Sequence, residues 1–469
     1  MQNEWRSDYA LKLVNLCMAA VALAMIACLI WSVNRGFDVL DEGFYLLLYA
    51  NPSEYIFTSS WYHIVSKLPK LCSPDLCNYR VLGLILRLLG AIIIATGTCV
   101  WLKHRIPTLN RQFFITISAV AVIANLVSYA VLPQTLSYNG MGAFLLFSAT
   151  GFLLLAAADK DGKTIAPMRA LSLVLAGFCI GGCLFVKITS ALAFMVTVPM
   201  LFVRNTNRWY LRLALVLIGV SGAILLYFAS CDTVSSWVER NREILTNEFQ
   251  DNNHLRATLI IHWFIDTIKI AARAGLVFGP LTLAALFFWR RKVVFGAICL
   301  GLVPASLYYA ARSSYFVRAD TFYVLGAVAI AAMIVQLLRN AEMKKWRVEY
   351  LGMLLFLALL PFCASVGTNN PIYWHMASNI CPWSMMTIGC SLAWSKRSNI
   401  VLVSSAALTL VFSTWIFIYG FVLHPYRLPS AIFEQKLPLD ANTTLPGVLV
   451  DLPTKQVVEQ VKSCLSHGG

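Results

Sequence analysis

Three carboxylates lie within five residues of one another, directly after the first long apolar run of the chain: Asp38, Asp41 and Glu42. A carboxylate held beside a substrate can take a proton from a hydroxyl group, which is general-base catalysis. The following stretches, 44–50 and 54–68, are aromatic and amphipathic, which predicts one or two helices lying in a membrane interface. Any solvated loop of this length also carries acids, so an ordinary charged loop remains the alternative.

The composition indicates the elements that must position these carboxylates. Of the 469 residues, 59% are hydrophobic and only 13% are charged, and the mean hydropathy is +0.71. Soluble proteins carry about 25% charged residues. The pattern predicts an all-α polytopic membrane protein of about 13 transmembrane helices. The predicted spans are 11–33, 79–101, 112–132, 140–158, 170–186, 188–203, 211–229, 274–289, 293–311, 321–338, 349–366, 378–394 and 398–419.

The charge distribution predicts the orientation. The net charge is +15, and the basic residues are spread through short loops between apolar runs. This favours anionic membrane lipid over nucleic acid as a partner, and it places the N-terminus in the cytoplasm. The polar bulk then lies outside, in a first loop at 34–78, a second at 230–273 with a surface helix, and the C-terminal tail.

The domain organisation follows from these spans. Residues 1–419 are expected to form one transmembrane module, and residues 420–469 a small outer tail with one helix at 454–465. A tail of this size is too short to be an independent catalytic domain. Cys72 and Cys77 flank a short outer turn, where either a local disulfide or two free thiols would fit.

A membrane-embedded first helix, then the Asp41–Glu42 pair, then interfacial helices resemble the GT-C glycosyltransferases. The protein-O-mannosyltransferase and aminoarabinose-transferase branch is the most similar. The architecture matches over most of the chain, but specific residues match only at Asp41 and Glu42. In that branch an Asp of the first extracytoplasmic loop is the general base, which implies this role for Asp41, with Glu42 and Asp38 beside it.

The resemblance also implies a reaction and a place. The expected enzyme sits in a bacterial cell inner membrane and transfers a sugar from a polyprenyl-phosphate donor with inversion. The acceptor would be a glycolipid, a polysaccharide or a protein at the periplasmic face. Inverting transfer needs a base for the acceptor and positive groups for the departing phosphate.

Basic residues near the outer boundary are the candidates for that phosphate: Lys187, Arg312, Arg318 and Arg87. Lys187 lies where two apolar runs meet, and bacterial relatives of the resembled family often place a Lys at a similar junction. Arg87 lies about two turns inside a predicted membrane helix, so it needs a partner, for which Asp38, Asp41 or a lipid phosphate would serve. For each cation, snorkelling towards headgroups is the alternative.

Two uncharged outer turns carry groups that suit sugar hydroxyls and sugar faces. One contributes Tyr138 and Asn139, and the other contributes His375. The same residue types are ordinary in turns and in the aromatic belts of membrane proteins. No His-x-x-x-His spacing is present, so we predict no metal and no cofactor. Some GT-C branches use a divalent ion.

Two other function classes compete with this interpretation. A transporter or lipid flippase would favour broken helices and ionisable residues at mid-membrane, whereas the acids here gather at the outer surface. An O-antigen polymerase or ligase would concentrate its polar residues in a large late loop, whereas the acidic cluster here comes in the first loop.

Overall fold

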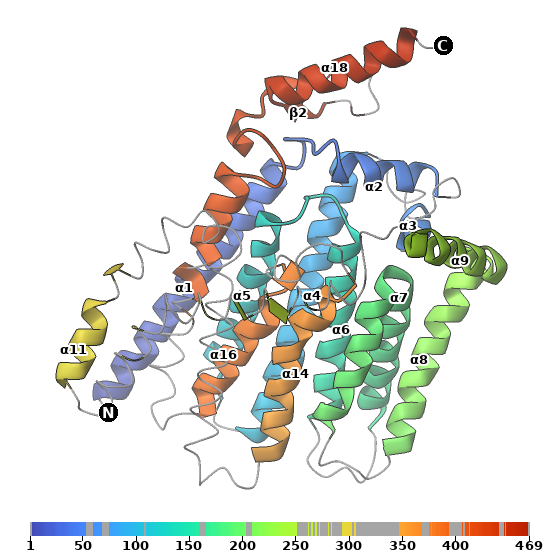
Figure 1. Ribbon diagram of the computed structural model, residues 1–469. Coiled ribbons are helices and arrows are strands. Elements are labelled where there is room, and N and C mark those ends of the chain that lie inside the picture. Colours follow the sequence, from blue (N-terminus) through green and yellow to red (C-terminus); the bar gives the residue numbers. More distant parts are fainter. Residues whose placement is uncertain are drawn as a thin grey trace.

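The structure is a computed structural model and is mostly helical (Figure 1). It describes residues 2–52, 60–67, 75–106, 109–158, 166–202, 209–250, 293–302, 347–367, 375–376, 378–393, 409–411, 413–439 and 447–467, with isolated positions between 261 and 305 and at 406 and 445.

Seven helices in this described part are long and apolar enough to cross a membrane. The chain is therefore a multi-pass, mainly helical membrane protein, as predicted. The total of about 13 spans stays a prediction, because spans 274–289 and 321–338 fall almost wholly outside the described residues. The seven are Leu11–Trp31, Leu76–Arg105, Arg111–Ala130, Tyr138–Ala157, Pro167–Leu201, Trp209–Ser230 and Val348–Ser365.

Most helices of the bundle begin and end within a few residues of the predicted limits, although the first begins at Gln2, well before the predicted start at Leu11. Several start with a capping side chain: Asp75, Asn110 and Ser137 each accept a hydrogen bond from a backbone N–H of the first turn. The bundle comprises α1 (Gln2–Trp31), α4 (Leu76–Arg105), α5 (Arg111–Leu126) with η2 (Val127–Ala130), α6 (Tyr138–Ala157), α7 (Pro167–Thr197) with η3 (Val198–Leu201), α8 (Trp209–Ser230), α14 (Arg347–Ser365) and α16 (Cys381–Ala393).

The helix α7 doubles back at Lys187, whose backbone leaves the helical region (φ −157°, ψ 87°). Before this residue α7 runs parallel to α8. After it α7 runs antiparallel to α14. The contacts are Gly177 with Val216 and Phe185 with Tyr227 before the turn, then Lys187 with Ala364 and Met200 with Gly352 after it. The described residues thus agree with two short spans, 170–186 and 188–203, although the apolar segment is continuous.

The segments predicted to lie outside gather at one end of the bundle, which we call the loop end (Figure 1). It carries α2 (Asp41–Ala50) and α3 (Trp61–Val65), which agree with the interfacial helices expected in the first loop. It also carries α9 (Val234–Gln250) where a surface helix is predicted, and α18 (Leu452–His467) over the predicted tail helix. A further helix, α11 (Val293–Gly301), lies within the predicted span 293–311.

A small sheet is a departure from the all-α prediction. Strand β1 (Leu437–Pro438) pairs antiparallel with β2 (Leu449–Val450). Leu449 also exchanges backbone hydrogen bonds with the first loop: its N–H donates to Asn34 O, and its carbonyl accepts from the Gly36 N–H. The tail between η6 (Ile418–Leu423), η7 (Ile432–Glu434) and α18 is therefore tied directly to the loop that carries the carboxylates.

Candidate functional site

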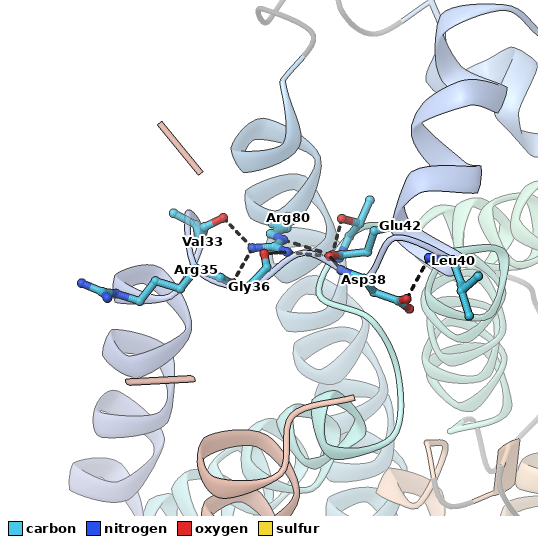
Figure 2. Close-up of polar contacts among 8 residues, drawn as sticks. Val33, Arg35, Gly36, Asp38, Leu40, Glu42 and Arg80 are labelled. Carbon is cyan, nitrogen blue, oxygen red and sulfur yellow. Dashed lines mark hydrogen bonds and ion pairs between the residues drawn. The ribbon is translucent and has the colours of Figure 1, made fainter. Parts of the chain in front are cut away.

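The first loop is held in place by a buried ion pair between Arg80 of α4 and Glu42 of α2 (Figure 2). The Arg80 guanidinium donates to both carboxylate oxygens of Glu42, at 3.0 Å from Nε and 2.6 Å from Nη2. It also donates to the backbone carbonyls of Val33, Arg35 and Gly36, at 2.8 to 2.9 Å. One arginine thus ties the end of α1, the loop and the start of α2 to α4.

Glu42 has no oxygen left for a reaction. Besides Arg80, it accepts from the Thr135 N–H and hydroxyl and from the Asp38 N–H. Burial by itself would raise the pKa of Glu42, but the Arg80 charge and these hydrogen bonds outweigh it and lower the pKa. The carboxylate stays ionised, and its contacts give it a structural part. None of these contacts supports the predicted catalytic role of Glu42.

Asp38 lies in the loop before α2 and is only 4% exposed. Its Oδ1 accepts the Leu40 N–H at 3.0 Å, which shapes the turn into α2 (Figure 2), while Oδ2 is buried without a hydrogen bond in the described part of the chain. Burial, and then the charge of Asp41, raise the pKa of Asp38 to about 6. This carboxyl is therefore poised between its neutral and charged forms near neutral pH.

Asp41 is the carboxylate that faces open space. It is the first residue of α2, a position that favours an anion. Its Oδ1 accepts from Arg427 Nη1 at 2.6 Å, and its Oδ2 accepts from the Tyr426 hydroxyl at 2.8 Å. Burial raises the pKa of Tyr426 well above its usual value, so the phenol remains a donor. Both partners come from the C-terminal tail.

An open cavity of about 200 Å³ lies in front of Asp41. It brings together three predicted residues of distant segments, Tyr138, Asn139 and His375, with the predicted base. The rest of the wall is aromatic and apolar, apart from Arg427. The described lining residues are Asp41, Phe44, Tyr45, Val131, Leu132, Pro133, Tyr138, Asn139, His375, Tyr426 and Arg427.

His375 enters this cavity as a neutral imidazole. Burial, and then the nearby charge of Lys187, lower the pKa of His375 to about 3. Lys187 itself lies behind the wall: its Nζ is 5.8 Å from the centre of the Tyr138 ring and donates to Ala364 O at 3.0 Å. The predicted Lys187 is thus next to the cavity but does not line it.

The remaining predicted cations divide into two cases. Arg87 is buried under the Tyr129 ring, with its guanidinium 5.3 Å from the ring centre, and its Nη1 makes no hydrogen bond in the described part. Of the three partners expected for Arg87, Asp38 bonds Leu40 and Asp41 pairs with the tail instead, and a lipid phosphate stays a prediction. Arg312 and Arg318 lie outside the described residues.

Sequence reasoning missed Tyr426 and Arg427, which lie nearly 400 residues from Asp41 in the chain. Their only signal in the sequence is the Pro425 turn just after the last apolar run. Within the part of the chain that is described, no cluster of three or more His, Cys, Asp or Glu side chains suits a metal ion. Cys72 lies outside the described residues, so the question of its pairing with Cys77 stays open.

The cavity is lined by one carboxylate, one guanidinium, a neutral imidazole, three tyrosines and one amide, together with apolar side chains. That set can hold a polyhydroxylated ligand and move a proton at Asp41. No protein-family model, no curated protein and no solved structure matches this chain.

Proposed function

We propose that the protein is a glycosyltransferase that moves a sugar from a polyprenyl-phosphate donor to an acceptor hydroxyl, with Asp41 as the general base. The observation that carries the proposal is the cavity itself. Asp41, Tyr138 with Asn139, and His375 come from three separate segments, were each singled out by residue type, and line one cavity. Perturbed and polar groups that converge in a cavity favour a substrate site.

A lipid route to the cavity supports a lipid-linked donor. Leu40, Phe44 and Leu47 are exposed apolar side chains at helical spacing along the start of α2. Phe44 belongs both to this apolar strip and to the cavity wall. A polyprenyl chain lying in the membrane interface along α2 would therefore bring its phosphate and sugar to Asp41.

In the proposed reaction, Asp41 takes the proton of the acceptor hydroxyl as that oxygen forms a bond to C1 of the sugar. The bond from C1 to the phosphate oxygen breaks on the opposite side, and the phosphate leaves with the electron pair, which inverts C1. Asn139, Tyr138 and the neutral His375 are placed to hydrogen-bond or stack on the sugar. The proposed setting is the periplasmic side of a bacterial inner membrane, with a glycolipid, polysaccharide or protein acceptor.

The test is sugar transfer in membranes that contain the wild type or Asp41→Asn, supplied with a panel of labelled polyprenyl-phosphate sugars. We expect the variant to lose at least about a hundredfold in rate at equal abundance. Glu459→Gln is the matched control, because it removes an exposed carboxylate from α18 at the same end of the molecule. Equal rates for Asp41→Asn and wild type would remove Asp41 as the base. If the wild type transfers no label from any donor, a transporter becomes the better hypothesis.

A further inference from the structure

The turn Pro425–Leu428 of the tail contacts both carboxylate oxygens of Asp41. Arg427 takes one oxygen and Tyr426 the other. Each oxygen of an ionised carboxylate can accept two hydrogen bonds, so Asp41 keeps a free lone pair on each oxygen within the described part of the chain, while the Arg427 guanidinium beside it also attracts any competing anion. A competing anion such as a phosphate can therefore take the guanidinium from Asp41 and leave one carboxylate oxygen without its donor.

Arg427 is the contact best suited to move. Its side chain is 41% exposed and that of Asp41 is 30% exposed. Exposed ion pairs of this kind are weak because water screens them, so a competing anion can displace the carboxylate at little cost. Tyr426, in contrast, is more deeply buried and lines the cavity.

The backbone at Arg427 is strained. A hydrogen bond from Leu428 N to Pro425 O, at 3.1 Å, closes the turn, and Arg427 is its third residue, with φ +54°. Among the described residues it is the one non-glycine with a positive φ. Glycine or asparagine is usual at such a position. An arginine kept there against this strain is a pointer to a function of its side chain.

The neighbouring residues fix the position of the turn against the first loop. A Cβ placed on Gly36 would lie 2.3 Å from Leu428 Cδ1, so the two segments are packed as closely as a glycine allows. Further along, Arg35 donates to Gln435 O at 2.9 Å. The backbone of the turn is therefore fixed over the cavity, and motion is left to the long side chain of Arg427.

The cavity otherwise lacks a positive group for a leaving phosphate. Arg427 is the one cation among the described residues that line it, since His375 is neutral and Lys187 is behind Tyr138. A guanidinium matches phosphate geometry with two parallel hydrogen bonds.

We propose that Arg427 is a latch that leaves Asp41 for the donor phosphate, so that binding of the phosphate both anchors the donor and frees the base. The inference rests on the proposed function for its substrate class. Its first step is an exchange of ion-pair partners at Arg427, in which no covalent bond changes. It predicts that Asp41 and the phosphate compete for one guanidinium.

The experiment measures binding of undecaprenyl phosphate to the purified full-length protein in detergent, with undecaprenol as the phosphate-free probe. The main variant is Arg427→Gly, which removes the guanidinium and relieves the positive φ, so the ligand-free protein should unfold close to the wild-type temperature. Lys436→Gln, which removes an exposed charge from the same tail, is the matched control.

We expect Arg427→Gly to weaken phosphate-dependent binding at least about tenfold, while Lys436→Gln binds as the wild type does. Asp41→Asn should bind undecaprenyl phosphate several-fold more tightly, because Arg427 is then free. A purely structural ion pair would give no such gain. Wild-type affinity in Arg427→Gly, no gain in Asp41→Asn, or no phosphate-dependent binding by the wild type would each overturn the latch.

The same variants separate the latch from the proposed function. If the wild type binds undecaprenyl phosphate through Arg427 but transfers no sugar, the latch stands and the transferase proposal fails. If Arg427→Gly transfers sugar with the rate and donor KM of the wild type, the transferase stands and the latch fails.

Discussion

Three neighbouring carboxylates of one loop have three different environments. Glu42 is buried and fully bonded to Arg80, Thr135 and the backbone. Asp38 is buried, and one of its oxygens has no hydrogen bond in the described part of the chain. Asp41 lines the cavity and accepts hydrogen bonds from the exposed Arg427 and from Tyr426. Residue type and spacing do not distinguish the three carboxylates in the sequence, so only their surroundings in the fold assign their roles.

The raised pKa of Asp38 predicts a pH-dependent stability. In the folded protein the pKa is about 6, against an ordinary value of 3.8. Between these values the folded state keeps a proton that the unfolded state has released, so folding stability falls as the pH rises from about 4 to 6 and then levels off.

The measurement is the thermal unfolding of wild type and Asp38→Asn in detergent across this pH range. The stability of the variant relative to wild type should rise by about 2 kcal/mol from pH 4 to pH 7. The contributions of the other titrating groups are the same in both proteins and cancel in the difference. A stability difference that does not change with pH would contradict the burial and the raised pKa of Asp38. Asp41→Asn should reduce the slope, because it removes the second cause of the shift.

At the scale of the elements, glycines set how closely the helices approach. Helices α4 and α6 meet at Gly97 and Gly151, where an added Cβ would lie within 2.3 Å of a backbone carbonyl of the partner helix. Small residues at helix interfaces are typical of membrane bundles, where close backbone contact replaces the hydrophobic effect. This packing positions the ends of α4 and α6, from which Arg80, Tyr138 and Asn139 reach the site.

Two glycines of α8 offer a direct test of that packing. A Cβ on Gly219 would lie 2.0 Å from Val174 O of α7, whereas a Cβ on Gly222 would meet no atom within 4 Å. We expect Gly219→Ala to lower the stability in detergent by about 1 to 3 kcal/mol through overpacking. Gly222→Ala should be neutral or stabilising by up to about 1 kcal/mol. Equal effects of the two substitutions would show that α7 and α8 do not approach as described.

At the scale of the whole molecule, the site is closed by two segments that lie far apart in the sequence, the first loop and the C-terminal tail. The first loop and the tail share backbone hydrogen bonds at Leu449 and an ion pair at Asp41. Both lie at the loop end with α3 and α9 (Figure 1). The orientation of this end therefore decides in which compartment the proposed acceptor must be found.

Sided labelling tests the proposed orientation. Cys464 of α18 is exposed, and Lys103 is exposed at the opposite end of α4. In a protein that keeps Cys464 as its sole cysteine, a membrane-impermeant maleimide should label intact spheroplasts. A cysteine-free protein with Lys103→Cys should be labelled only after permeabilisation. The reverse pattern would place the cavity in the cytoplasm and remove the periplasmic setting.

The sequence by itself determined the membrane class, the limits of most described helices and the loop that carries Asp41. Those features depend on local properties, since an apolar run of sufficient length must span and a polar amphipathic segment must stay at the interface. It also selected Tyr138, Asn139 and His375 by residue type. Their convergence at Asp41 was decided by tertiary packing, because it requires that helices far apart in the sequence end at the same end of the bundle.

Only the tertiary structure separated Glu42 from Asp41, paired Arg80 with Glu42, turned Arg87 towards Tyr129, and brought Tyr426 and Arg427 to the cavity. A charge in a sequence has no partner until folding supplies one. In a membrane interior that partner decides whether the charge is structural or available for chemistry, because an unpaired buried charge costs several kcal/mol or more. Pairings across nearly the whole chain leave no periodic or local trace in the sequence.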